Sequence, residues 1–440
     1  SDQKLQEDAL MSYVASVNYS YGDKYYASFS FRRDGSSRLS PDTRWGNFWS
    51  LSASWRLSQE KFMQSLKSVL SDLKLRASYG VNGNLPSSYY GYQSTYTTGA
   101  FYNGKPSPWE STLGNEELTW EKNYALNLGL DIGLFSRVNV SLDWYTRTTK
   151  DLLMSKQLNS ISGFSSLLTN VGQMRNTGVE LEVRSNNIKT KDFSWTTAFN
   201  LSHNKNKILK LADLPWFVDG RYVRKEGYPF NTIYLREYAG VDPETGSALY
   251  YDNQQDENGN YTKNKVTDPG QASPIPLKDI TPTISGGFMN TFNYKFIDLS
   301  FNLSYSFGGY SYDNASYILQ DDGYSVISNK STEQRRRWQK PGDITDVPRF
   351  VYGNKKGGNY NSSRAIHSTD HIRLKSLILG LNAPKAWLQK LGIGNARIYF
   401  SGTNLLTWAA YGQYDPEMSG VVGFYTPPLK TYAFGLELKF

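Results

Sequence analysis

The sequence predicts an all-β fold, a transmembrane antiparallel β-barrel, and three observations carry this prediction. Apolar and polar residues alternate with period two, the alternating stretches run for about ten residues or more, and the final stretch ends on an aromatic residue. A tilted strand needs about 9–11 residues to cross a bilayer, whereas strands of globular proteins usually have about 5–6. A soluble double-sheet protein also alternates, so the length of the stretches decides in favour of the membrane barrel.

The alternation recurs along the chain. Apolar residues fill every second position of residues 49–57, 124–132 and 297–307, and Ser, Asn, Gly and Asp hold most positions between them. Because successive side chains of a strand point to opposite faces, each stretch has one apolar and one polar face. The small hydrogen-bonding residues suit a wet lumen better than the charged surface of a soluble sandwich. We therefore expect Leu299 and Phe301, from the apolar face, to contact lipid.

The last stretch of the chain alternates without a fault over residues 430–440. Its apolar face holds five large side chains, Tyr432, Phe434, Leu436, Leu438 and Phe440. Chain ends of soluble proteins usually fray, whereas the closing strand of a barrel touches lipid and must pair with the first strand. An aromatic C-terminus after such alternation also resembles the assembly signal of outer-membrane barrel proteins. We therefore assign these five residues to that signal.

Composition supports the barrel and argues against other classes. The 440 residues are 39% hydrophobic with a mean hydropathy of −0.56, and they contain no apolar run long enough for a transmembrane helix. A barrel interleaves its apolar band with polar lumen residues, so average hydropathy understates its membrane character. Aromatic residues make up 15%, as expected if rings form girdles at both membrane interfaces. The chain has no cysteine, which excludes disulfides and thiolate metal sites, and its net charge of +8 is scattered, which argues against nucleic-acid binding.

Connection lengths predict the orientation of the strands. Short turns alternate with long segments, and outer-membrane barrels place short turns in the periplasm and long loops outside. The long segments are residues 34–44, 82–119, 155–173, 207–283, 309–369 and 409–429. Two longer links on the short side, residues 58–71 and 383–395, predict single amphipathic helical turns. Assigning residues 232–238 to a loop hairpin leaves about thirteen strands, the first and the last both running toward the periplasm.

An odd number of strands does not fit a complete bacterial barrel. Single-chain barrels have an even number of strands and no open edge. Residues 1–7 are polar, lack the features of a signal peptide and run directly into the first strand at Ala9. We therefore expect residues 1–440 to be the C-terminal part of one larger transmembrane β-barrel.

Several segments resemble the SusC-type TonB-dependent outer-membrane transporters of Bacteroidetes. The matching segments are FSFRRDGSSR (residues 29–38), LKLRASYGVNGN (73–84), LTWE (118–121), DWY (143–145) with TKDLL (149–153), NTGVE (176–180), and residues 397–405 running into YDPE (414–417). They keep the family's order and cover nearly the whole chain. The resemblance implies a roughly 22-stranded barrel whose lumen is plugged by an N-terminal domain. This chain would supply about thirteen C-terminal strands of it, with the plug and the first strands absent.

The resemblance also implies a function. Such a protein performs TonB-dependent, energy-coupled import of an oligomeric nutrient, a glycan or a peptide, across the outer membrane of a Gram-negative bacterium. Its partners would be a SusD-type surface lipoprotein that closes like a lid, the TonB complex acting through the missing N-terminal part, the remaining strands and plug, and outer-membrane lipid. Two alternatives remain: a barrel adhesin or enzyme that acts on glycans through its outer loops, and a soluble sandwich array that binds carbohydrate. We find no catalytic set and no cofactor motif, so no enzymatic activity is expected.

Two groups of residues have the composition of metal sites. His367 and His371 lie four positions apart, but that spacing brings two ligands together only on a helix, and they precede a strand. Asp252, Asp256, Asn258 and Asn260 resemble a calcium loop that lacks its closing acidic residue. A hairpin tip explains the second group better, and ordinary loop polarity explains the first.

The long loops carry candidate substrate-binding rings. They are Trp109, Trp216, Tyr222, Tyr228, Tyr324 and Trp338. Aromatic rings beside Asn, Asp and Arg suit stacking on sugar faces or gripping peptides. The alternative is that these rings pack into small cores of the loops themselves or contact a partner, and packing is the commoner role.

Overall fold

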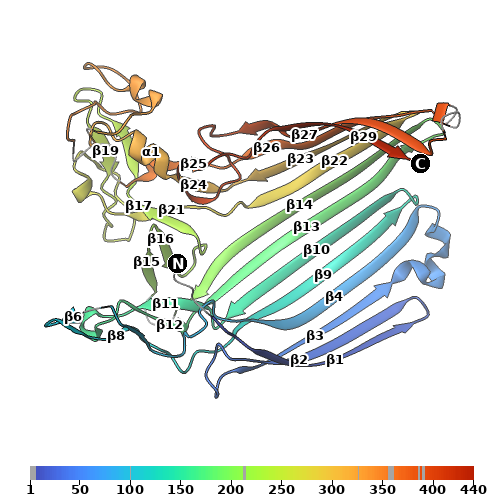
Figure 1. Cartoon of the computed structure of the whole chain (residues 1–440), viewed down its shortest axis with the longest axis horizontal. Helices are drawn as coiled ribbons and strands as arrows, with labels where there is room; N and C mark the ends of the chain where they lie inside the picture. The colour runs from blue at the N-terminus through green and yellow to red at the C-terminus, as the bar shows by residue number, and fades with distance from the viewer. Residues whose placement is uncertain are drawn as a thin grey trace. The chain divides into compact units, whose positions relative to one another are not determined.

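The chain forms two compact units. The computed structural model describes residues 6–99, 101–211, 215–325, 327–354, 361–384, 387–388 and 392–440. The first unit consists of Ser1–Ser185, Ser202–Pro215 and Lys225–Tyr228, and the second of Asn186–Leu201, Trp216–Arg224 and Pro229–Phe440. Each unit combines long strands with small elements that belong to the loops between them (Figure 1).

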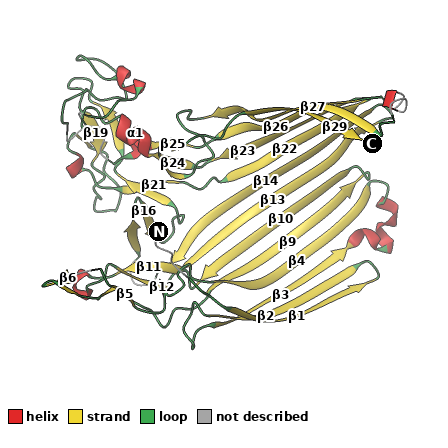
Figure 2. Ribbon diagram, in the orientation of Figure 1, coloured by secondary structure: helices red, strands yellow, loops and turns green. Residues whose placement is uncertain are grey.

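The long strands form a thirteen-stranded sheet in which each strand neighbours the next one along the chain (Figure 2). They are β1 (Leu10–Tyr21), β2 (Tyr25–Ser36), β3 (Trp45–Arg56), β4 (Leu70–Asn84), β9 (Glu121–Leu134), β10 (Val138–Lys150), β13 (Gln173–Lys189), β14 (Phe193–Lys210), β22 (Ile284–Tyr294), β23 (Ile297–Phe307), β26 (His371–Asn382), β27 (Asn395–Ala409) and β29 (Thr431–Lys439). The predicted all-β class and the predicted number of strands are confirmed.

Short turns join the strands in pairs at one end. Between β1 and β2 the turn residues Gly22 and Asp23 have φ angles of +59° and +54°, and Phe135 and Ser136 between β9 and β10 have +52° and +54°. Two positive φ values in a two-residue turn match the right-handed twist of the flanking strands. The link between β3 and β4 holds the 3₁₀ helices η1 (Leu57–Gln59) and η2 (Lys61–Leu66), which confirms the helical turn predicted there. The turn predicted at residues 383–395 lies partly outside the described residues.

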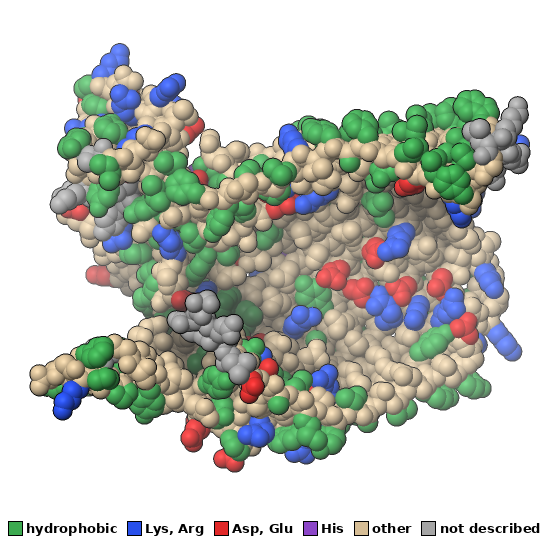
Figure 3. All heavy atoms as spheres, viewed as in Figure 1, with side chains coloured by type: hydrophobic (Ala, Val, Ile, Leu, Met, Phe, Trp, Pro, Cys, Tyr) green, Lys and Arg blue, Asp and Glu red, His purple; other side chains and the backbone are tan. Residues whose placement is uncertain are grey.

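The strand register of the first unit separates an apolar face from a polar one. Phe29 of β2 lies opposite Val17 of β1 and Leu51 of β3, and all three side chains are exposed. On the other face the hydroxyl groups of Ser28 and Ser52 hydrogen-bond at 2.7 Å. Figure 3 shows acidic and basic side chains gathered close together on the polar face of the strands. A sheet with such a large exposed apolar face is suited to contact lipid.

The register of the second unit joins the apolar residues of four strands into one row. Leu299 of β23 pairs with Leu379 of β26, which pairs with Phe400 of β27, which pairs with Phe434 of β29. Phe434 is 82% exposed, although a phenyl ring in water is unfavourable. The pairing thus places Leu299, which the alternation assigns to the lipid face, in one row with Phe434 of the last strand.

Strand β26 departs from regular pairing at one residue. Ser376 pairs with Asn302 of β23, but Leu374 pairs with Leu303, so that Lys375 has no partner and forms a bulge. The bulge moves the apolar face from even to odd positions of the strand. The sequence carries the signal, since residues 372 and 374 are apolar before the bulge and residues 377, 379 and 381 after it.

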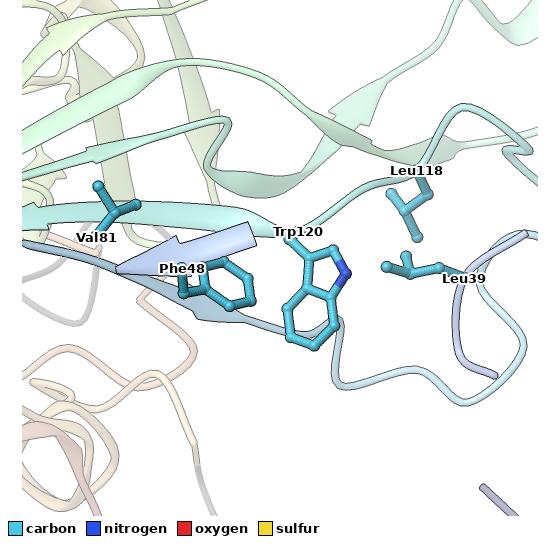
Figure 4. Close-up of a cluster of buried hydrophobic side chains, with 5 residues drawn as sticks. All are labelled: Leu39, Phe48, Val81, Leu118 and Trp120. Carbon is cyan, nitrogen blue, oxygen red and sulfur yellow. The ribbon is translucent and has the colours of Figure 1, made fainter. Parts of the chain in front are cut away.

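The described residues in the long loops of the first unit form hairpins, and some of them join residues of β3 and β4 in a buried core. The hairpin strands are β5 (Thr95–Thr97), β6 (Phe101–Tyr102), β7 (Lys105–Pro106), β8 (Trp109–Thr112), β11 (Leu153–Gln157) and β12 (Ser166–Asn170), with the 3₁₀ helix η3 (Ser160–Ser162) between the last two. The core consists of Leu39, Phe48, Val81, Leu118 and Trp120, where the rings of Phe48 and Trp120 meet edge to face at 5.2 Å (Figure 4).

The long loops of the second unit form three small sheets. The first contains β15 (Trp216–Asp219), β16 (Tyr222–Lys225), β17 (Thr232–Leu235) and β21 (Ile275–Asp279); the second contains β18 (Tyr238–Val241), β19 (Ala248–Tyr251) and β20 (Lys265–Val266); the third contains β25 (Ile366–Ser368), β24 (Tyr310–Asp313) and β28 (Gly420–Val422). The helices are α1 (Asn314–Leu319), η4 (Pro269–Gln271), η5 (Thr332–Arg336) and η6 (Ser363–Ala365). Residues 232–238 thus belong to the loops, as predicted. Among the described residues, no helix is long and apolar enough to cross a membrane.

Candidate ligand-binding pocket in the outer loops

The loops of the second unit enclose a pocket of about 260 Å³. Helix α1 and the segment after β27 supply most of its lining, which includes Asp313, Gln320, Tyr411, Tyr414, Phe424 and Tyr425. Ligand pockets combine apolar walls with a few polar groups that fix orientation, and this lining has that character.

Asp313 ends strand β24 and begins helix α1. Its carboxylate accepts a hydrogen bond from the backbone N–H of Ser316 at 2.8 Å, as an N-cap aspartate does. The second carboxylate oxygen accepts a hydrogen bond from the hydroxyl group of Tyr411 at 3.0 Å. Asp313 is only 3% exposed, and both of these donors are neutral groups.

The ring of His367 stacks on the ring of Tyr411, with centroids 3.7 Å apart. Burial lowers the pKa of His367, and the nearby carboxylate of Asp313 opposes this shift. Burial, and then Asp313, raises the pKa of Tyr411 well above its usual range. The imidazole is therefore neutral and the phenol protonated at neutral pH, so neither group balances the charge of Asp313.

The YDPE segment braces the loop that lines the pocket. Arg373 of β26 is 2% exposed at its side chain and donates to Asp415 at 2.6 Å and to Glu417 at 3.0 Å. Lys375 binds the same carboxylate of Glu417 at 2.6 Å. These bonds fix residues 415–417 to the end of a membrane strand. The motif that signalled the family in the sequence thus has a structural role here.

A second buried network supports the chain after helix α1. Asp322 is fully buried and binds Arg364 at 2.6 Å, and Gln334 donates to the same carboxylate at 2.9 Å. Next to it, Asp321 binds Lys330. Buried charges are tolerated when they are paired and hydrogen-bonded, as these are.

The two groups with the composition of metal sites have other partners. His371 Nδ1 lies 2.8 Å from the carbonyl oxygen of Thr369, whereas His367 packs against Tyr411. The carboxylate of Asp256 accepts hydrogen bonds from the N–H groups of residues 258 and 260, which is the geometry of a tight turn, so the predicted hairpin tip is confirmed. Within the described ranges no group of His, Cys, Asp and Glu has a geometry that would hold a metal ion.

The predicted aromatic residues have diverse surroundings, and none of them lines the pocket. In the second unit, Trp338 donates from Nε1 to the carbonyl oxygen of Pro243 at 2.8 Å, and Tyr222 packs beside a hydrophobic core. Trp216 and Tyr324 are exposed. In the first unit, Trp109 is 61% exposed, and Tyr228 lies under the ammonium group of Lys225.

Sequence reasoning missed the rings that do line the pocket. Tyr411, Tyr414, Phe424 and Tyr425 all belong to the predicted long segment 409–429, in which no ring was selected. The signal that points to them is the YDPE segment in the same loop, whose acidic residues hold the loop in place.

The first unit has a hollow of its own on the polar face of its strands. It measures about 410 Å³, and small polar residues such as Asn18, Ser28 and Ser52 line it together with Arg76. The guanidinium group of Arg76 binds Asp131 at 2.8 Å and Asp143 at 2.9 Å, which fixes it across three strands. The hollow offers hydrogen-bonding groups beside small apolar residues such as Ala27 and Ala53.

Comparison with known proteins identifies the fold family. The family model described as "TonB dependent receptor-like, beta-barrel" matches residues 6–272. The chain belongs to this family. It is therefore a β-barrel protein of the outer membrane, and the class predicted from the alternating strands is confirmed.

Relatives support the narrower resemblance to SusC-type proteins. TonB-dependent receptor P3 of Formosa agariphila is 33% identical over 99% of this chain and 46% of its own length. TonB-dependent receptor SusC of Bacteroides thetaiotaomicron is 30% identical over 100% of this chain and 45% of its own length. The structure of the RagAB peptide transporter superimposes with a TM-score of 0.89 at 31% identity, covering 98% of this chain and 48% of that one. The chain thus spans about half the length of the relatives it matches. These relatives bear the names of receptors and transporters, not of enzymes.

Proposed function

We propose that the protein to which this chain belongs imports an oligomeric nutrient, a peptide or a glycan, across the outer membrane in a TonB-dependent manner. The observation that carries the proposal is the likeness to the RagAB peptide transporter over 98% of the chain. Peptide is the favoured class because that structural relative is named for peptide transport. We further propose that the protein binds and moves its ligand and catalyses no reaction, in contrast to a barrel adhesin or a glycan-cleaving enzyme.

We also propose that residues 1–440 form the C-terminal part of a plugged, roughly 22-stranded barrel. Strands β1 and β29 are the two edges of the thirteen-stranded sheet, which supports pairing with further strands. An unpaired backbone group in hydrocarbon costs several kcal/mol, so long open edges are not tolerated there. The polar hollow beside Arg76 fits contact with a plug domain, through which the TonB complex would act.

A SusD-type surface lipoprotein is the proposed partner at the outer loops. The exposed rings in the loops of the first unit, such as Trp109, support a contact surface for another protein. Affinity purification of the full-length protein from detergent extracts is expected to recover this lipoprotein. Recovery of the transporter alone, under conditions that preserve its barrel, would contradict the partnership.

The aromatic residues selected from the sequence remain proposals as substrate contacts. Trp109, Trp216 and Tyr324 are exposed, which leaves their rings accessible to a ligand. Tyr222, Tyr228 and Trp338 have packing partners within the loops, which favours a bracing role.

Uptake by living cells tests the function. Cells that lack the gene, cells complemented with it, and complemented cells without TonB are given labelled peptide and oligosaccharide pools. Import that needs both the gene and TonB supports the proposal, and the pool that enters identifies the nutrient class. If neither pool enters, or if import continues without TonB, the proposal is wrong. Cleavage of either pool by the purified protein would favour the enzyme alternative.

A further inference from the structure

The pocket beside helix α1 contains a buried negative charge without a cation to balance it. Among the described residues, no lysine, arginine or charged histidine forms an ion pair with Asp313, although its side chain is almost completely buried. Asp321, Asp322 and Asp415 in these loops each bind a lysine or an arginine, whereas buried Asp252 resembles Asp313 in that neutral donors hold its carboxylate. A buried charge normally has a partner of opposite sign, because removal from water costs free energy that hydrogen bonds alone rarely return.

The walls of the pocket are suited to a cation. Tyr411, Tyr414, Phe424 and Tyr425 present aromatic rings, whose faces attract ammonium and guanidinium groups. Phe424 and Tyr425 are 68% and 64% exposed, so that two of the rings remain open to an incoming group. Gln320 in the same lining has a side-chain carbonyl oxygen that accepts hydrogen bonds. A neutral sugar gains nothing from the charge of Asp313, whereas a basic side chain does.

The volume of the pocket limits what enters it. Pockets that hold a whole drug-sized ligand usually measure about 300–1,000 Å³, and this one has about 260 Å³. It is large enough for one side chain of a longer molecule and too small for an oligomer. The rest of an oligomeric ligand would lie outside it.

We infer that this pocket binds the positively charged side chain, lysine or arginine, of an oligopeptide ligand. The inference rests on the proposed import function and adds to it a charge preference and a position. Asp313 supplies the opposite charge, and the rings of Tyr411, Tyr414, Phe424 and Tyr425 enclose the aliphatic stem and the cationic head. A partner protein that inserted a basic residue would use the same chemistry, and the experiment separates the two sources.

Peptide binding to the full-length protein in detergent tests the inference. The probes are short peptides, acetylated and amidated to remove terminal charges, that differ only in a central Lys, Gln or Glu. We expect the Lys peptide to bind about tenfold more tightly than the Gln peptide, and the Glu peptide to bind most weakly. The preference should shrink at high salt, because it is electrostatic.

Two substitutions locate the preference. Asp313→Asn keeps an N-cap acceptor and is expected to bring the affinity for the Lys peptide to within about twofold of that for the Gln peptide. Tyr425→Ala removes an exposed ring and should reduce the preference without affecting folding. The matched controls are Asp268→Asn, which changes the N-cap of η4, and Tyr352→Ala, which removes an exposed ring elsewhere; both should keep the preference.

The outcomes distinguish this inference from the proposed function. Equal binding of the three peptides, a preference that survives both pocket substitutions, or an equal loss in the controls would overturn the pocket assignment. Loss of lipoprotein binding in Asp313→Asn with unchanged peptide binding would assign the pocket to a partner residue and also overturn it. A charge preference in purified protein that imports nothing in cells would retain the pocket and refute the importer.

Discussion

A hairpin region of the first unit, residues 95–112, and the loops of the second unit differ in how they bury their aromatic rings. In the first unit, the hairpins formed by residues 95–112 leave their rings in solvent, and Tyr102 is 80% exposed. In the second unit, the loops build their own cores, such as the one around Ile233 and Tyr312, and bury ion pairs such as Asp322 with Arg364. Aromatic residues in long loops therefore serve two purposes in one protein. Rings without a core to join remain exposed, whereas rings inside a core are buried and brace the loops.

The largest expected effect comes from breaking a buried ion pair in the second unit. Asp322→Ala leaves the cation of Arg364 buried without a partner, which should destabilise the loop by about 3–5 kcal/mol. Hydrogen exchange over residues 309–369 measures this. The control is Asp346→Ala, which removes an exposed pair with Arg336 and should cost less than about 1 kcal/mol. Equal protection in the two variants would mean that the loop does not depend on its buried charges.

The effect of a substitution in a long strand should depend on the face of the sheet it lies on rather than on how buried the residue is. Phe301→Arg places a charge on the face shared with Leu299 and Leu379, and should cost about 2–4 kcal/mol and reduce barrel assembly. Asn302→Arg on the opposite face should be tolerated. Barrel assembly is measured as the fraction of the protein that stays folded in detergent until it is heated. If both variants assemble equally well, the assignment of the lipid face is wrong.

Two tryptophans compare the loop regions directly. Trp338 packs over Gly246, which has a φ of +68° and no room for a side chain beneath the ring, so Trp338→Ala should destabilise its loop by about 1–3 kcal/mol. Trp109→Ala should change stability by less than about 0.5 kcal/mol, because its ring is mostly in solvent. Protease sensitivity of each loop is the measurement. A stronger effect at Trp109 would show that residues 95–112 pack around Trp109 in a core of their own.

The smallest expected effect is a change in the pH dependence of stability at the link between β3 and β4 of the first unit. Hydrogen bonds from Tyr25, Lys24 and Trp55 lower the pKa of Glu60 from 4.5 to about 2. The folded state thus binds fewer protons than the unfolded state, so this contribution is complete above pH 4.5 and is lost as the pH falls toward 2. Glu60→Gln should flatten the acid side of the stability profile slightly. An unchanged profile would show that these bonds do not persist in solution.

The strands could be predicted from the sequence because a period of two is a local property of each segment. The row from Leu299 to Phe434 follows from that alternation and from antiparallel pairing of neighbours. The bulge at Lys375 also has a local signal, since the apolar positions change there from even to odd. The same change interrupts the alternation by which a strand is recognised.

The pocket could not be predicted in the same way. Its lining combines residues 313–320 with residues 411–425, and only the folded loops bring these segments together. Exposure of a ring depends on whether a core lies nearby, which composition does not reveal. The six rings selected from the sequence therefore divide between exposed and packed positions, and the rings of the pocket were missed.

The attachment of Glu417 to both Arg373 and Lys375 determines how the pocket loop responds to force. Lys375 is the unpaired residue of β26 and Arg373 lies two residues before it, and both hold the same carboxylate. A pull on the loop is thus carried at two points into a strand that pairs with β23 on one side and β27 on the other. We therefore expect the loop to move together with the sheet rather than to bend at a hinge. A force that a departing ligand exerts on the loop would therefore be transmitted to the membrane strands.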